Sequence, residues 1–152
     1  MKRLSTLVVL LLFVSACSGA SSAMVARRTI EATGLGVAAS YRVLKNAYEV
    51  ESNRVIDELT QSGGTYEDYM QAMMPFSRAM DALDVVADLL EEGLRLVGVW
   101  ETTSDIRREW RVWCRAAIAT TTSLVNTIRL AGVPIPNELT AALTIVRELL
   151  GE

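Results

Sequence analysis

The sequence predicts an all-α fold: an elongated antiparallel bundle of three long helices followed by one short C-terminal helix. Apolar residues recur at steps of three and four along most of the chain, which is the spacing of one helix face. Runs of alternating β-branched residues between turns, the pattern of strands, do not occur in the sequence. Breaks rich in glycine, proline and small polar residues separate the periodic segments, and short connections of this kind place neighbouring helices antiparallel. The length of 152 residues suits a single domain.

The first helix is expected over about residues 24–61. Two glycines within it, Gly34 and Gly36, either let a neighbouring helix approach closely or mark a bend. The run Gln61–Gly64 ends the helix. The apolar positions that form its inner face are Ile30, Val37, Tyr41, Leu44, Tyr48, Val55 and Leu59.

Thr65 followed by Asp68 is a variant of the capping box and predicts the start of the second helix. Pro75 lies within this helix and predicts a kink or break near residues 71–74, because proline removes a backbone hydrogen bond and clashes with the preceding turn. The helix carries the most regular heptad pattern of the chain, which predicts a packing seam. Its positions are Tyr66, Tyr69, Met73, Phe76, Met80, Leu83, Ala87, Leu90, Leu94 and Val97.

After a turn near residues 100–103, the capping signal Thr102–Asp105 precedes a third helix that ends near Ala131. Gly132 is a helix stop, and the two prolines of residues 133–136 predict an extended segment. Asn137 is expected to cap a short helix over residues 138–150 that returns to cover one end of the bundle. The inner positions are Ile106, Trp110, Trp113, Ala117, Leu124 and Ile128 in the third helix, and Leu139, Leu143, Val146 and Leu150 in the fourth.

The N-terminus has the layout of a targeting segment. Lys2 and Arg3 precede eight apolar residues, Leu7–Val14, a run much shorter than the roughly 20 residues that span a bilayer as a helix. The next residues complete the run Val14-Ser15-Ala16-Cys17, which resembles the lipobox of bacterial lipoproteins. The resemblance covers residues 1–17 alone. It implies cleavage before Cys17, a diacylglycerol on the cysteine thiol and an acyl group on its new amine.

On this interpretation residues 1–16 are the signal peptide, 17–22 are the lipidated cysteine with a short flexible tether, and 23–152 are the helical bundle. By the same resemblance, a serine rather than an aspartate at position 18 favours the periplasmic leaflet of the outer membrane. The alternatives are ordinary secretion, with cleavage after Ala20 or Ala23, and a retained membrane helix.

Composition argues against several classes of function. The chain contains no histidine, which removes the commonest general base and metal ligand, and it has no glycine-rich phosphate loop or nucleophile elbow. Without Lys2 and Arg3 its net charge falls from −3 to −5, which disfavours a nucleic-acid partner. Beyond Cys17 the sole cysteine is Cys114, for which a buried, inert thiol is the simplest interpretation. We therefore expect no catalytic residues, no metal site and no cofactor.

Two charged stripes are the candidate interaction face. Four carboxylates follow helical spacing on the second helix, and three arginines do so on the third. Ion pairs between the two helices are the favoured interpretation, and a cation site formed by the carboxylates is the alternative. The residues are Asp81, Asp84, Asp88 and Glu91, with Arg108, Arg111 and Arg115.

Tryptophans and methionines form a second candidate. Trp100, Trp110 and Trp113 either fill the core near one end of the bundle or line an aromatic pocket. The methionines at positions 70, 73, 74 and 80 belong to the core and its flank, or else to an adaptable binding surface.

Together these features predict a membrane-anchored helical lipoprotein of the bacterial envelope with a structural or protein-interaction role. Its expected partners are membrane lipid, through Cys17, and an envelope protein or a second copy of itself. The alternatives are a binding module for an apolar ligand, and a phage-encoded lipoprotein acting in lysis or superinfection exclusion.

Overall fold

The computed structural model describes residues 19–100 and 106–151 of the chain. Within these ranges the chain forms four helices and no strand, so the predicted all-α class is confirmed. The helices are α2 (Gly19–Ser62), α3 (Tyr66–Trp100), α4 (Arg107–Leu130) and α5 (Asn137–Leu150). The leader through Ser18 and the capping signal Thr102–Asp105 lie outside the described residues.

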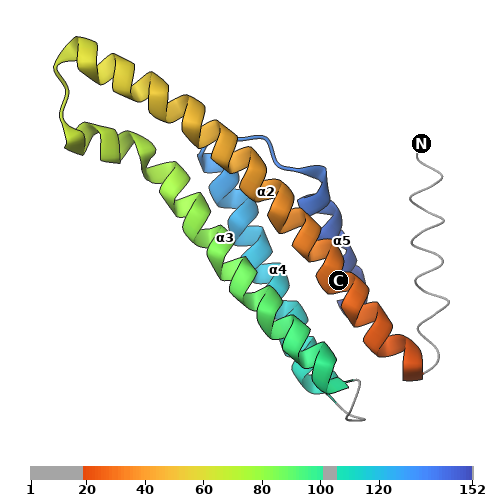
Figure 1. The fold of residues 1–152 in the computed structure, drawn as a ribbon. Coiled ribbons are helices and arrows are strands. Elements are labelled where there is room, and N and C mark those ends of the chain that lie inside the picture. The colour runs from red at the N-terminus through yellow and green to blue at the C-terminus, as the bar shows by residue number, and fades with distance from the viewer. Residues whose placement is uncertain (1–18, 101–105, 152) are drawn as a thin grey trace, which may run out of the picture.

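The four helices run alternately in opposite directions and surround a common core (Figure 1). Helix α2 packs against α3 and α5, and α4 also packs against α3 and α5. The short helix α5 therefore lies along the bundle as its fourth member, and the expectation that it covers one end was wrong. A helix in a bundle buries its apolar face against the helices on its two sides. Helix α3 is one neighbour of both α2 and α4, and α5 is the other.

Helices α2 and α3 are longer than α4 and α5, with 44 and 35 residues against 24 and 14. Leu130, the last residue of α4, lies beside Met74 and Pro75 of α3. Residues 52–72, which we call the arm, therefore extend past the end of α4 as a two-helix hairpin (Figure 1).

Helix α2 begins at Gly19, so residues 19–22 of the expected flexible tether are helical. Adding a residue to an existing helix costs far less than nucleating one, so a stretch of small residues can extend a long helix that is already formed. Among the described residues, no helix is both long and apolar enough to cross a membrane.

The helix ends follow local sequence signals. The backbone of Gly132 is left-handed, at φ +71°, and its N–H donates to the Arg129 carbonyl at 2.9 Å, while Val133 N–H donates to Ile128 at 3.2 Å. This pair of bonds is a Schellman motif, and it confirms Gly132 as the stop of α4.

The capping box that starts α3 is also confirmed. The backbone N–H of Thr65 donates to the Asp68 carboxylate at 2.8 Å, and the N–H of Asp68 donates to the Thr65 hydroxyl at 3.3 Å. The Thr65 hydroxyl itself donates to the same carboxylate at 2.7 Å. These hydrogen bonds hold the pKa of Asp68 below its usual value.

The predicted cap of α5 needs correction, and of the two outcomes predicted at Pro75 the structure shows the kink. Helix α5 is capped by Pro136, whose carbonyl accepts the N–H groups of Leu139 and Thr140, so Asn137 is already the first helical residue. Helix α3 continues through Pro75 without a break. Its first turns are inclined to the rest of the helix in Figure 1, which is the kink that a proline within a helix produces.

The core confirms the predicted inner face of α4. All six expected positions are buried, and Cys114, Thr121 and Val125 join them. The apolar residues of this set belong to two clusters, one around Leu124 and Ile128 with Phe76 of α3, and one around Trp110 and Trp113.

The predicted seam of α3 is only partly correct. Met73, Phe76, Leu83 and Val97 are buried, whereas Tyr66, Ala87 and Leu94 are exposed. Helix α3 packs against both α2 and α4, so the centre of its buried face lies between the two contacts rather than on the heptad seam. The residues that take the remaining buried places are Ala79, Val86, Gly93 and Leu96.

The buried side of α2 is unusually rich in small residues. Thr29, Thr33 and Ser40 are buried, and each hydroxyl donates to the carbonyl four residues earlier at 2.8–2.9 Å. A Cβ added to Gly36 would come within 2.9 Å of Leu139 Cα, so Gly36 permits the close approach of α5. Of the expected inner face, Tyr41 and Tyr48 are exposed instead.

Candidate interaction surfaces

The acidic and arginine stripes lie on the surface, with all seven side chains exposed. The predicted ion pairs between α3 and α4 are absent from the described residues. The ion pairs found there join side chains three or four residues apart within one helix, as in Arg95 to Glu92 at 2.6 Å. Exposed pairs of this type add little to stability.

Helical geometry explains why the stripes do not meet. Asp84 and Asp88 each stand two residues from the buried Val86, and Arg111 and Arg115 each stand two residues from the buried Trp113. Two residues correspond to about 200° around a helix, so both stripes point away from the core and from each other. The prediction that the two stripes form ion pairs with each other was therefore wrong, because neither stripe lies on the side of its helix that faces the other helix.

The alternative interpretation of the acidic stripe, a cation site, receives no support. In the described part of the chain, no group of three or more Asp, Glu, Cys or His side chains is placed to hold a metal ion.

The tryptophans fill the core. The rings of Trp110 and Trp113 stack with their centroids 4.7 Å apart, and both side chains are buried. The indole N–H of Trp113 donates to the Leu89 carbonyl at 2.7 Å. A Cβ at Gly93 would lie 2.7 Å from this ring, so α3 carries a glycine where the indole packs against it. Trp110 and Trp113 are therefore core residues, as predicted, whereas Trp100 is half-buried and packs against the same cluster, with its ring centroid 6.0 Å from that of Trp110.

The methionines divide between core and surface. Met73 is buried and Met80 is half-buried, whereas Met70 and Met74 are exposed. Met74 lines a hollow of ≈ 370 Å³ between α3 and the end of α4, with Arg78 and Leu130. This hollow is an open surface feature at the base of the arm.

Cys114 is buried, and desolvation raises the pKa of its thiol to about 12. The thiolate is the reactive form of cysteine, so this side chain is chemically inert in the folded protein. We expect Ellman's reagent to leave Cys114 unmodified in the native protein and to modify it after denaturation in urea. Rapid modification of the native protein would contradict the assigned face of α4.

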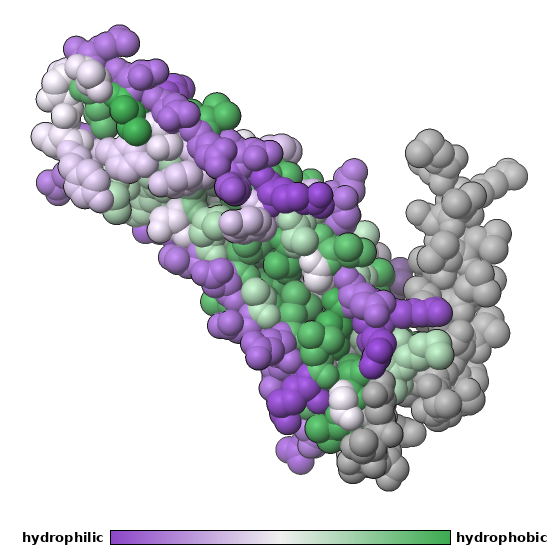
Figure 2. Space-filling model, in the orientation of Figure 1, coloured by the Kyte–Doolittle hydropathy of each residue, from purple (hydrophilic) through white to green (hydrophobic). Residues whose placement is uncertain are grey.

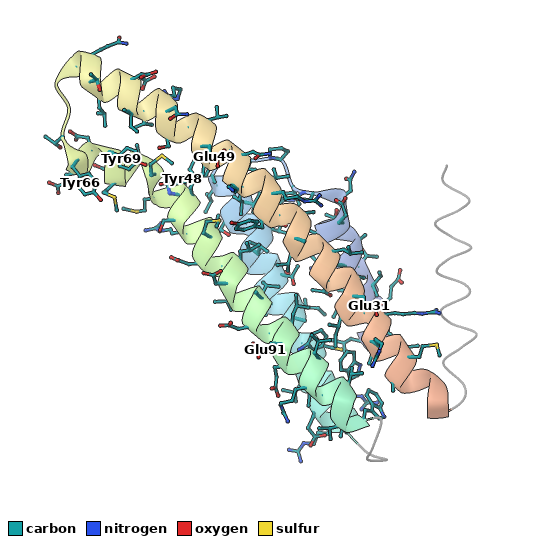
Figure 3. The ribbon with its side chains drawn as sticks, in the orientation of Figure 1. Glu31, Tyr48, Glu49, Tyr66, Tyr69 and Glu91 are labelled. Carbon is teal, nitrogen blue, oxygen red and sulfur yellow. The ribbon has the colours of Figure 1, made fainter. Side chains whose placement is uncertain are left out.

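A group of tyrosines at the arm was missed by the sequence analysis, which treated each as a separate seam position. The Tyr69 hydroxyl lies 2.9 Å from Ser52 Oγ and 3.2 Å from the Tyr48 hydroxyl (Figure 3). The ring of Tyr66 stacks on Tyr69, with 6.2 Å between centroids. The hydrogen bond from Ser52 lowers the pKa of Tyr69, because it stabilises the phenolate. These polar contacts join the two helices beside the buried Val55, which belongs to the core cluster.

The fold and its surfaces define an all-α four-helix bundle with a projecting two-helix arm. Compared with models of protein families, with curated proteins and with solved structures, the chain matches none.

Proposed function

We propose that this chain is a lipid-anchored protein of the bacterial cell envelope that acts through protein contacts rather than catalysis. The observation that carries the proposal is the position of the lipobox-like run. It ends at Cys17, and α2 begins at Gly19, so an acylated Cys17 would join the lipid to a long helix almost directly. Two or three acyl chains are enough to hold a domain on a bilayer.

The shape of the bundle supports a role in contact with partners. Helix α2 extends from the anchor end to the tip of the arm, a length of about 66 Å for its 44 residues. A protein built in this way presents its long sides and its arm at a distance from the lipid surface. Surface apolar side chains occur along this length, among them Ile56, Tyr66 and Met70 on the arm.

The envelope location follows from the same proposal. Ser18 at the position after the cysteine favours the outer membrane, with the bundle in the periplasm. The burial of Trp110 and Trp113 argues against an apolar-ligand module, and interaction with a protein is the function that the exposed surface suits best.

Replacement of Cys17 by serine tests the anchor. The full chain, expressed in a bacterium with its leader, should fractionate with membranes, and its intact mass should exceed that of residues 17–152 by a diacylglycerol and an acyl group. The Cys17→Ser variant should lose the lipid mass and either leave the membrane or keep its leader.

Cys114→Ala is the matched control, because it removes the buried cysteine and leaves the leader unchanged, so its membrane retention should equal that of the wild type. A soluble wild-type protein whose N-terminus is Ser21 or Met24 would contradict the proposal and indicate ordinary secretion.

A further inference from the structure

Four of the six methionines of the chain lie close together on α3, at positions 70, 73, 74 and 80. Met73 belongs to the core cluster and Met80 packs half-buried against it, so both have a packing role. Met70 and Met74 are instead 50% and 43% exposed. Core packing therefore does not account for this second pair.

Met70 and Met74 lie one helical turn apart on the same side of α3. Residues four positions apart on a helix have Cβ atoms separated by roughly 6 Å. Methionine is unbranched and flexible, and its thioether sulfur lies near the end of the side chain. Both sulfur atoms can therefore reach one ion placed between them, with no change in the helix.

The end of α4 leaves this side of α3 open to solvent. Met74 lines the hollow of ≈ 370 Å³ at the base of the arm, together with Leu130, the last residue of α4. Met70 stands one turn closer to the tip of the arm, beyond the end of α4. Figure 2 shows apolar surface along α2 and α3 of the bundle, whereas the hollow lies on the side of α3 that faces α4.

The kink at Pro75 adds an oxygen donor to the same turn of α3. Proline has no N–H, so the carbonyl of Gln71, four residues earlier, lacks the hydrogen bond that an α-helix normally provides. Gln71 and Pro75 line the hollow with Met74. Two thioether sulfur atoms and one carbonyl oxygen thus belong to a single turn beside the hollow.

The charges nearest to the pair along α3 have opposite signs. Glu67 precedes Met70 by three residues, Arg78 follows Met74 by four, and both are exposed. No acidic cluster among the described residues is placed to hold an ion, so a hard divalent cation lacks its oxygen ligands here. Thioethers are soft ligands, and among biological metals they select Cu(I).

We propose that Met70 and Met74 bind a soft monovalent cation, Cu(I), at the base of the arm. The two sulfur atoms are its ligands, and the Gln71 carbonyl is a further donor. The sequence-based expectation of no metal site considered histidine, cysteine and carboxylate ligands, and it did not weigh thioethers. The inference goes beyond the proposed function and does not depend on the anchor at Cys17.

Titration with Ag(I) tests the site, because Ag(I) shares the preference of Cu(I) for sulfur and is stable in air. The full chain, with isotope-labelled methionine methyl groups, is extracted from membranes in detergent and followed by NMR in a chloride-free buffer. The methyl signals of Met70 and Met74 should shift together and saturate at one ion per chain. The signals of the buried Met73 and of Met24 should stay in place.

Replacement of each methionine by leucine removes the sulfur and nearly keeps the apolar volume. Met70→Leu and Met74→Leu should each weaken Ag(I) binding at least tenfold. Met24→Leu is the matched control, because Met24 is 53% exposed and has no second methionine one turn away, so its affinity should equal that of the wild type. Circular dichroism should show the same helix content in all three variants.

The charge in the hollow gives a test in the opposite direction. Arg78 lines the hollow with Met74, so Arg78→Gln removes a positive charge and should strengthen the binding of a cation. Unchanged affinity in Met70→Leu would overturn the site. Equal shifts of Met24 and Met70 without saturation would also overturn it, since exposed thioethers would then bind Ag(I) without a site.

The cysteines are the other soft ligands of the chain, and two measurements separate them from the methionines. Cys114→Ala and Cys17→Ser should show the same shifts at Met70 and Met74 as the wild type, whether or not Cys17→Ser stays with the membrane. The anchor and the ion site can therefore fail separately. A thioether carries no proton, so the affinity should be constant between about pH 5 and pH 8. An affinity that rises steeply with pH would indicate a thiolate ligand and overturn the proposal.

Discussion

Truncation of Phe76 or Leu83 to alanine is expected to lower the free energy of unfolding by about 2–5 kcal/mol. Both side chains lie in the core cluster shared by α2, α3, α4 and α5, and they are 7% and 4% exposed. Removing them costs the transfer free energy of the lost atoms and leaves a cavity that the surrounding helices fill only in part. Urea titration followed by circular dichroism at 222 nm measures the change.

Asp84→Ala and Asp88→Ala are the matched controls on the same helix. Both carboxylates are exposed, so each variant should lose less than about 1 kcal/mol. Equal losses in the apolar and the acidic variants would mean that α3 is rotated from the orientation described here. If α3 presents its acidic stripe to a partner, the two aspartate variants should stay folded and bind that partner less tightly.

The two neighbouring glycines of α2 should respond to alanine in opposite directions. At Gly36 a Cβ would lie 2.9 Å from Leu139 Cα and 3.2 Å from the Glu138 carbonyl oxygen, so α5 has to move away. Overpacking of this kind costs about 1–3 kcal/mol, of which the higher helix propensity of alanine offsets about 1 kcal/mol. Gly36→Ala is therefore expected to lower the melting temperature.

Gly34→Ala should raise the melting temperature, because its Cβ meets open space and the variant gains up to about 1 kcal/mol of helix propensity. Thermal unfolding of both glycine variants, followed by circular dichroism, measures the two shifts. A shift of the same sign for both glycines would show that α5 does not approach α2 as closely as the structure indicates.

Features that depend on a few neighbouring residues could be predicted from the sequence. The capping box of Thr65 and Asp68 and the Gly132 stop are local hydrogen-bond patterns, so a short window of sequence contains all the groups involved. The inner face of α4 was also predictable. Large apolar residues such as Trp110 and Trp113 recur there at helical spacing. They form one regular apolar stripe, so the helix has a single face that can be buried.

Which side of α2 and α3 is buried depends on how the four helices pack together. A heptad pattern marks the side of a helix that packs against one partner helix. Helices α2 and α3 each pack against two partner helices, so the buried face of each is shifted towards its second partner. The contact of Gly36 with Leu139 joins residues about a hundred positions apart, and nothing in either local sequence indicates it. Thr29, Thr33 and Ser40 could enter the core because their hydroxyls bond within their own helix, which makes polar residues compatible with burial. Periodicity places a residue on a helix, but its burial depends on the neighbours that the whole chain brings to that helix.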